Sequence, residues 1–586
     1  MLCEVYDEQQ RPLESLSTLL RHRNVDVPRK AFRIKLFATK PRRLRSACAV
    51  AVRISLCSDA PSWTLKSEEA TQEGVPLPQQ KTTLPILGNI LDFIKNNDVF
   101  HDWISSLVQE FDGEPCLLTA PGRPDTLVIS TPEAFEKVTK RQFDTFIKGE
   151  YLHEMFYDLM GDALTNNDGE VWQFQRKIFA KLFSARALRE SITSTIQKYG
   201  RVVHKLFENA AETRESFDLF RLFSQFTIES FAEIGFDIQL CSLAIGEDHP
   251  FEKAFDIAQE ATAKRFSVPS WLWKLQRLLG VGSEGELQRA VKVLDMTVLK
   301  FISESIASRA RGEVDPQLLR SIVVASILAG RDTSSETLSW FVYTLSQHPE
   351  VEQRIRDEMF EKIPRLAAEP GYFPCMDEVL SLTYLEAAIK KTLRLYPLAS
   401  FNIKHCSADT YLSDGTFVPE GTTIGLPSYA MGRLASTWGP DCNEYTPERF
   451  LDSDTGKLLS VSPFKFPALF AGPRICVGMN LTMLEMKVVL AGLLSQFHVA
   501  VQPGQDAAHE NPAHGEDRAR GGADRLGQVE VTLLCVYDWL AVFFTFILSG
   551  QKERPIGAID RIRTVRFVFS ILKSFGPSSD NATFPV

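Results

Sequence analysis

The residues with the clearest potential for chemistry surround one cysteine, Cys476. Phe470, Gly472 and Arg474 precede it, and Gly478 follows at the start of an apolar run with helical periodicity. This spacing predicts a rigid turn that places a thiol at a helix N-terminus, where N–H groups and the helix dipole favour a thiolate. A thiolate beside an arginine that can pair with a carboxylate is typical of a haem site. The alternative is a buried core cysteine, the commoner role of a lone Cys.

The run resembles the haem-binding loop of the cytochromes P450, whose pattern is F-x-x-G-x-R-x-C-x-G. Four positions match it: Gly472, Arg474, Cys476 and Gly478. The phenylalanine position holds Leu469, and Phe470 follows one residue later. The resemblance implies a mainly α fold with small β-sheets, with Cys476 as the axial ligand of a haem b iron and the rest of the loop holding the cofactor.

A second pair of candidate cofactor ligands, Trp172 and Arg176, lies in a stretch with helical periodicity. Residues four apart share one face of a helix. In P450s a W-x-x-x-R pair reaches a haem propionate, since the indole N–H is a donor and arginine pairs bidentately with carboxylates. The resemblance implies the same role here. A surface arginine beside a core tryptophan is the alternative.

Residues 316–348 predict one long helix, with Pro316 at its start and Pro349 just past its end. Its middle contains Gly330, although glycine in a helix costs about 1 kcal/mol relative to alanine. The family equivalent, A/G-G-x-D/E-T, crosses the distal face of the haem. The resemblance implies that Gly330 leaves room for dioxygen and that Asp332 and Thr333 are catalytic, supplying protons. The alternative is a local bond from Thr333 to the backbone four residues earlier, with Asp332 solvated.

One position departs from the family pattern. P450s almost always carry E-x-x-R on a helix, braced by a downstream arginine, but Lys391 stands where the glutamate is expected before Arg394. Arg449 matches the downstream partner, so the resemblance implies structural roles for Arg394 and Arg449. Losing one partner of a buried pair costs about 3–5 kcal/mol. Glu386 lies about 12 Å away along a helix and is a poor substitute. The chain tolerates the change, holds haem in a weakened fold, or carries a sequence error.

Composition narrows the class of protein. The chain has 586 residues, 44% hydrophobic, which is ample for a large core. Its net charge of −9 provides no basic face for nucleic acid. The ten cysteines form no C-x-x-C pair, which indicates neither a zinc site nor a disulfide framework. These features predict a reducing, cytosol-facing environment.

The ends of the chain differ from its centre. Residues 1–83 are basic and predicted to be poorly ordered, and residues 84–502 resemble a whole P450 domain. No apolar run in 1–83 is long enough to span a bilayer, whereas related eukaryotic P450s usually begin with a membrane helix. Residues 503–586 begin with a polar segment and show none of the closing strands usual in the family. Within them Val531–Leu548 is a possible short transmembrane segment, although Asp538 opposes insertion by about 2.5–3.5 kcal/mol.

Further elements must position these motifs. Residues 101–111 predict an amphipathic helix, 126–131 a strand, and the stretch after Thr131 a second helix with Pro132 at its first position. Turn signals in 402–433 predict a small β-hairpin region. Two sequence segments in this region, DGTFVPEGT and SYAMGR, resemble those of the P450 group that hydroxylates the ends of fatty-acid chains in plants and fungi.

Together these features predict a haem-dependent monooxygenase that hydroxylates an apolar substrate, such as a fatty acid. The resemblance implies dioxygen as co-substrate and electrons from NADPH. No nucleotide-binding Gly-rich loop is present, so a separate flavoprotein reductase is the expected partner. The resemblance further implies membrane association at the endoplasmic reticulum, facing the cytosol. A haem-binding or scaffold protein without turnover is the alternative, motivated by Lys391.

Overall fold

The computed structural model describes residues 35–37, 51–53, 77–97, 99–213, 216–236, 238–246, 249–307, 316–501 and 527–532. The chain divides into two units, Met1–Thr64 and Leu65–Val586. In the first, the described residues form one antiparallel pair, β1 (Lys35–Phe37) with β2 (Ala51–Arg53). The candidate site and the elements that position it belong to the second.

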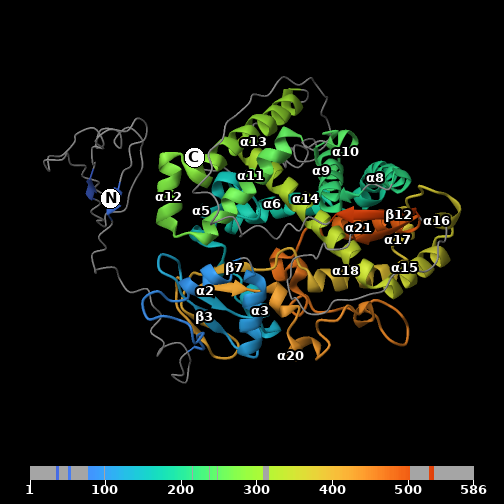
Figure 1. The fold of residues 1–586 in the computed structure, drawn as a ribbon. Coiled ribbons are helices and arrows are strands. Elements are labelled where there is room, and N and C mark those ends of the chain that lie inside the picture. Colours follow the sequence, from blue (N-terminus) through green and yellow to red (C-terminus); the bar gives the residue numbers. More distant parts are fainter. Residues whose placement is uncertain are drawn as a thin grey trace, which may run out of the picture. The chain divides into compact units, whose positions relative to one another are not determined.

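The second unit is mainly helical, as predicted (Figure 1). Its N-terminal helical segments are α2 (Ile90–Lys95), α3 (Phe100–Glu110), α4 (Pro132–Glu136), η1 (Lys137–Arg141), α5 (Gly149–Met160), α6 (Gly169–Leu182), α7 (Ala185–Ala187), η2 (Leu188–Ile192), α8 (Thr193–Thr213), α9 (Leu219–Phe236), α10 (Ser242–Ile245), α11 (Pro250–Lys264), η3 (Arg265–Ser267), α12 (Ser270–Leu279) and α13 (Gly282–Ala307).

The C-terminal helical segments begin with the longest helix of the described chain, α14 (Pro316–Gln347). The others are α15 (Pro349–Lys362), α16 (Arg365–Ala368), α17 (Met376–Val379), α18 (Thr383–Leu395), α19 (Ser428–Met431), α20 (Ala435–Trp438), η4 (Pro447–Phe450), η5 (Pro467–Leu469), η6 (Gly472–Arg474) and α21 (Met479–Leu494).

Small sheets flank the helices. The five-stranded sheet has the order β3-β4-β10-β7-β5, with β10 parallel to β4 and antiparallel to β7. Its strands are β3 (Cys116–Leu118), β4 (Thr126–Val128), β10 (Thr423–Leu426), β7 (Asn402–Cys406) and β5 (Phe146–Ile147). The hairpin predicted within 402–433 is present as an antiparallel pair: β8 (Thr410–Tyr411) with β9 (Phe417–Val418).

A third sheet joins β11 (Phe497–Val501), β12 (Gly527–Thr532) and β6 (Phe217–Asp218), all in parallel pairs. The sequence analysis found no closing strand in this region, and β12 corrects that expectation for its six residues. The alternation of Val529, Glu530 and Val531 is typical of a strand, but the longer apolar run that starts at Val531 obscures it in the sequence. The rest of Val531–Leu548 lies outside the described residues.

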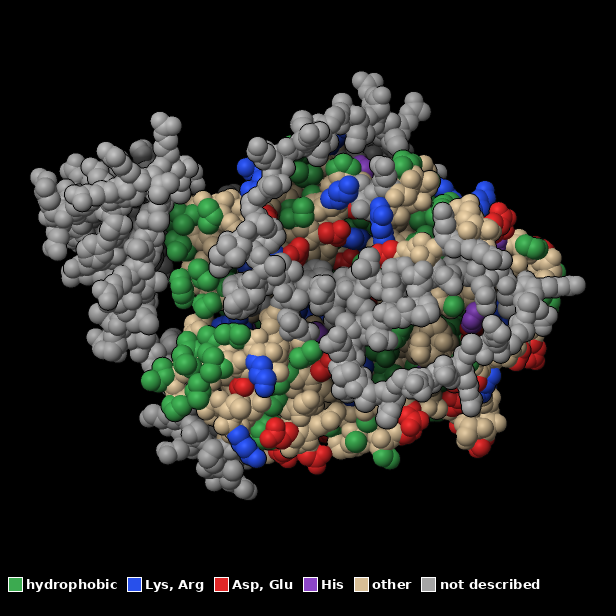
Figure 2. All heavy atoms as spheres, in the orientation of Figure 1, with side chains coloured by type: hydrophobic (Ala, Val, Ile, Leu, Met, Phe, Trp, Pro, Cys, Tyr) green, Lys and Arg blue, Asp and Glu red, His purple; other side chains and the backbone are tan. Residues whose placement is uncertain are grey.

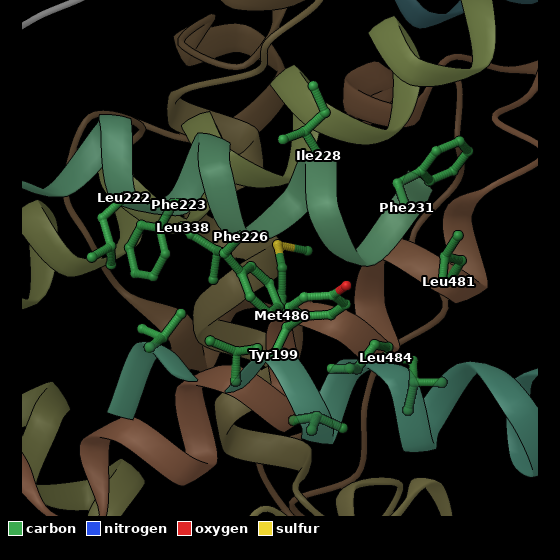
Figure 3. Packing of buried hydrophobic residues seen from close by; sticks show 14 of the residues in the cluster. Tyr199, Leu222, Phe223, Phe226, Ile228, Phe231, Leu338, Leu481, Leu484 and Met486 are labelled. Carbon is green, nitrogen blue, oxygen red and sulfur yellow. The ribbon is translucent and has the colours of Figure 1, made fainter. Parts of the chain in front are cut away.

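Helix α14 is the structural centre of this unit. It begins at Pro316 and is followed directly by Pro349 of α15, as the two prolines predict. Most of its length is buried, and it packs most extensively against α9. Figure 3 shows the core in which aromatic and aliphatic side chains of α8, α9, α14 and α21 interdigitate, among them Tyr199, Phe226, Leu338 and Met486.

The second predicted helix is shorter than its sequence suggested. Thr131 accepts a hydrogen bond from Ala134 N at 3.3 Å and Pro132 opens α4, as predicted. After Glu136, however, the chain continues as a single π-helical turn, η1, and leaves the helix at Arg141. Thr139 in this turn lies against the loop that carries Cys476. The contact at Gly472 is so close that an added Cβ would lie only 2.2 Å from the Thr139 carbonyl oxygen.

A buried arginine, Arg265, connects the two ends of the segment that contains α12. Arg265 is 1% exposed and donates to Glu284 Oε1 at 2.8 Å and to Asp158 Oδ2 at 2.6 Å. It also donates to the carbonyl of Met155 at 2.7 Å, and its guanidinium lies 4.4 Å from the ring centre of Trp273. Arg265 therefore joins α5, η3, α12 and α13.

Within the residues that the structure describes, no helix combines the length and the apolar character needed to cross a membrane.

Candidate functional site

The loop before α21 brings Cys476 to the start of that helix. Gly472 has φ +66, a conformation that glycine adopts without strain, and its contact with Thr139 leaves no room for a side chain. Phe470 also has a positive φ of 62, and its ring packs edge-on against Phe135 at 5.6 Å. The backbone N–H of Cys476 donates to the carbonyl of Leu469 at 2.9 Å. These contacts hold the cysteine turn in one conformation.

The thiol of Cys476 is partly exposed and partly surrounded by protein. The residue has exposed surface, yet burial raises the pKa of its thiol above the ordinary value. The backbone N–H groups of Gly478 and Met479 and the charge of Arg176 act in the opposite direction, as expected at a helix N-terminus. In the protein alone the effect of burial is larger. A thiol that is accessible and surrounded by protein suits a ligand that enters and supplies positive charge.

Cationic and aromatic side chains gather beside this loop. The Arg474 guanidinium lies 4.7 Å from the Trp172 ring and pairs with Asp168 Oδ1 at 2.5 Å, but its buried Nε has no partner among the described residues. Lys404 of β7 is 2% exposed, and its Nζ is likewise unpartnered there. Burial and the charges of Lys148 and Arg474 lower the pKa of Lys404. Two unsatisfied buried cations indicate a site for an anionic ligand.

Lys148 completes this cluster. Burial and Arg474 lower the pKa of its amine to about 8, and Asp168 opposes them. Because Asp168 is the one carboxylate that influences this group, the cations are in excess. The sequence analysis missed Lys148, Asp168 and Lys404. Of these residues, only Lys404 could have been recognised from the sequence as a buried charge. Its spacing of two residues from Cys406 places both side chains on the same, buried face of one strand.

The middle of α14 carries the predicted motif with Gly330, Asp332 and Thr333. Ala329 is exposed although the helix before it is buried. At Gly330 an added Cβ would lie 2.2 Å from Cδ2 of Phe231 in α9, so the packing of the two helices leaves no room for a side chain there. Thr333 Oγ1 donates to the Ala329 carbonyl at 2.6 Å, which is the local bond considered as an alternative.

Two carboxyl groups lie one turn apart on α14. Burial raises the pKa of Asp332 above its ordinary value, while Arg331 and a hydrogen bond from Gln259 oppose that shift. Glu336, one turn later, has a pKa raised to about 8 by burial and by Asp332. Burial therefore favours the protonated form of both carboxyl groups.

The structure brings Lys391, Arg394 and Arg449 together, as the family pattern predicts. Lys391 is 0% exposed, and burial with the charges of Arg394 and Arg449 lowers its pKa to about 7. Glu386 does not substitute for the missing carboxylate, since it pairs with Lys390 at 2.9 Å and with Lys487 at 3.0 Å.

The arrangement fits a flat, dianionic cofactor with a metal centre. It combines an accessible thiol at a helix N-terminus with unpartnered buried cations beside the same loop, and α14 carries an exposed alanine. A family model described as "Cytochrome P450" matches residues 78–317 and 300–515. The chain belongs to the cytochrome P450 family. It is an oxidoreductase of the monooxygenase class, and the family implies a haem-thiolate cofactor and a redox partner that delivers electrons.

Similar P450s come from plants. The chain is 32% identical to Cytochrome P450 CYP94D109 of Paris polyphylla over 65% of this chain and 80% of the relative. It is 30% identical to Cytochrome P450 94B1 of Arabidopsis thaliana, covering 75% and 88% of the two chains. It is also 30% identical to Cytochrome P450 94A2 of Vicia sativa, covering 76% and 90%. The alignments therefore span most of each relative.

Proposed function

We propose that this P450 hydroxylates an unactivated C–H bond of an apolar chain, a fatty acid or a similar lipid. The observation that carries the proposal is the accessible thiol of Cys476 at a helix N-terminus, accompanied by unpartnered buried cations and by the buried carboxyl groups of α14. The choice of a lipid substrate rests on the sequence DGTFVPEGT in the hairpin region and on the similarity to P450s of the 94 and 86 groups.

Each side chain has a proposed task at the haem. Cys476 is the axial ligand, and the turn of Phe470, Gly472 and Gly478 presents its sulfur. The side chains that hold the two propionates are Trp172, Arg176, Arg474, Lys148 and Lys404. The bound haem supplies dioxygen activation, and a thiolate ligand favours O–O cleavage.

The acid groups of α14 have the proposed task of proton delivery. Asp332 accepts a hydrogen bond from Gln259, which orients its carboxylate, and Glu336 stores a proton one turn away. Thr333 can donate its hydroxyl proton to the Ala329 carbonyl or turn it towards a ligand. Packing of Phe231 against Gly330 fixes the position of this turn.

Electrons have NADPH as their proposed source, delivered by a separate flavoprotein reductase. The turn η1, which covers the cysteine loop, carries the exposed side chains of Lys140 and Arg141. Both side chains pair with Glu136, and the positive charge that remains on this turn attracts an acidic redox partner.

The proposed location is the cytosolic face of the endoplasmic reticulum membrane. Exposed apolar side chains are Leu84, Ile86, Leu87, Leu91, Ile94 and Val99 around α2, and Trp271, Leu275, Leu278, Leu279 and Val281 around α12. The two groups are neighbours through the turn after β3, where Gly122 adjoins Pro269 and Arg123 lies over the Phe93 ring. Hydrophobic side chains gather on this edge in Figure 2. A contiguous apolar surface of this kind suits shallow insertion into a lipid interface.

A second candidate, haem binding or scaffolding without turnover, is favoured by one observation. Lys391 leaves a buried amine without a described partner at the position where the family braces the haem-side fold. An unpaired buried charge lowers stability, so haem retention and turnover need separate measurements.

Carbon monoxide binding to the reduced protein separates these functions. Thiolate ligation gives a strongly red-shifted Soret band, which Cys476→Ser should abolish and Cys375→Ser should leave intact, since Cys375 is an exposed thiol near α17. Turnover is then measured with reductase, NADPH and long-chain fatty acids. A red-shifted band without product from any lipid would favour the inert haem protein, and the absence of the band would refute thiolate ligation.

A further inference from the structure

Three cationic side chains converge where the family places one carboxylate. Lys391 and Arg394 lie on one face of α18, three residues apart, and Arg449 approaches from η4. Lys391 and Arg394 are 0% and 1% exposed, and the Arg449 side chain is 20% exposed. The charges of both arginines act on the Lys391 amine.

Each of the three contributes a buried nitrogen without a hydrogen-bond partner in the described chain: Lys391 Nζ, Arg394 Nε and Arg449 Nε. The terminal nitrogens of the arginines are engaged elsewhere. Those of Arg394 donate to the carbonyls of Gly432 and Cys442, and one of Arg449 donates to the carbonyl of Trp438. One donor of each side chain is therefore left without a described protein partner at the position of the missing carboxylate.

Nearby groups do not neutralise this charge. Asp441 pairs with Arg449 and is half exposed, and its charge acts on Lys391 and Arg394 less strongly than burial and the neighbouring arginines do. The Cys442 thiol donates to the Arg433 carbonyl, and Arg433 itself adds a further positive charge that acts on Arg394. Lys465 lies 4.7 Å from the Trp438 ring on the far side of Arg394. The cluster is left with several cations and one exposed carboxylate.

We propose that Lys391, Arg394 and Arg449 form a binding site for a small monovalent anion, such as chloride or formate, in place of the family glutamate. Burying an unmatched cation costs several kcal/mol, and a buried donor without a partner adds to that cost. One anion accepts from all three nitrogens and removes both penalties. The site is structural and uses none of the residues proposed to hold the haem.

The site makes stability dependent on the anion rather than on ionic strength. Above the dissociation constant, each tenfold rise in chloride raises the folding equilibrium constant tenfold. The test is thermal unfolding of the full-length protein at pH 6.5 in chloride–gluconate mixtures of constant ionic strength. We expect the unfolding temperature of the wild type to rise with the logarithm of the chloride concentration above the dissociation constant. We also expect broadening of the ³⁵Cl NMR line that formate reverses.

Variants locate the effect. Lys391→Glu supplies its own carboxylate and should lose the chloride response, whereas Lys292→Glu makes the same change of net charge at an exposed position of α13 and should keep it. Lys391→Met, which removes the amine without adding charge, provides a second comparison if the first variant folds poorly. Equal unfolding temperatures of the wild type in chloride and gluconate would overturn the proposal. So would an undiminished response in both Lys391 variants.

Discussion

Replacement of Lys391 by glutamate should stabilise this protein, although most substitutions of a fully buried residue destabilise. The amine is 0% exposed and its Nζ has no partner among the described residues. Glutamate at the same helical position lies one turn from Arg394, where its carboxylate can accept from that arginine and from Arg449. The change therefore converts three neighbouring cations into a carboxylate between two arginines.

The size of the effect follows from the pKa of Lys391. A fall from 10.5 to about 7 corresponds to about 5 kcal/mol of native-state cost for the charged amine, at 1.36 kcal/mol for each pKa unit. Part of the gain is offset because the new carboxylate loses its hydration. We expect Lys391→Glu to raise the free energy of unfolding by about 2–4 kcal/mol at pH 7 in a halide-free buffer.

The gain also depends on pH in a definite direction. Below pH 7 the Lys391 amine is protonated in both folded and unfolded chains, so the full cost is present. Between pH 7 and 10.5 only the unfolded chain keeps this proton, so the stability of the wild type rises with pH. The advantage of Lys391→Glu should accordingly shrink as the pH increases through this interval.

Urea unfolding of both proteins at several pH values measures this difference, and the haem retained after gel filtration gives an independent readout. Lys292→Glu is the matched control for net charge. A Lys391→Glu variant that is no more stable and retains no more haem than the wild type would refute the argument. A stability gain that stays constant from pH 7 to 10 would show that the buried amine is not its source.

Three further variants test other parts of the structure. Gly330→Ala places a methyl 2.2 Å from Phe231, so it should destabilise the fold by about 1–3 kcal/mol in thermal unfolding, and Phe231→Leu in the same chain should recover part of that loss. Asp332→Asn should lower turnover by roughly 10²–10⁴-fold while leaving the carbon monoxide spectrum unchanged; equal turnover would remove Asp332 from the proton path. Lys404→Met should stabilise the haem-free protein, because it removes an unpaired buried amine, yet accelerate haem transfer to apomyoglobin; unchanged transfer would exclude Lys404 as a propionate ligand.

The sequence predicted what is encoded locally. The turn before Cys476, the extent of α14 between two prolines and the cap at Thr131 all depend on neighbouring residues, and each is present. The family pattern also predicted that Arg394 and Arg449 would meet at Lys391. These features were accessible because turn chemistry, helical periodicity and caps act over a few residues.

Features that depend on distant segments were not predictable in the same way. Lys148 and Lys404 join Arg474 only because β7 and the start of α5 meet at one place in the fold. The need for glycine at position 330 comes from Phe231 on another helix, which no local pattern indicates. The helix after Thr131 ends early because η1 must contact the cysteine loop, a tertiary effect that overrides local propensity.

The contacts of Arg265 have a consequence for motion. They join the end of α11 to the start of α13, so the segment between Arg265 and Glu284 is a loop with both ends pinned. Within its helix, α12, only Trp273 is buried. A segment with few buried contacts and fixed ends can open locally at a free energy far below that of global unfolding. Arg265 also holds Trp273 of α12, and Lys274 and Arg277 of α12 pair with Glu154 and Asp158 of α5. Local opening of α12 must therefore break these contacts, while the Arg265–Glu284 pair keeps the end of α11 and the start of α13 together.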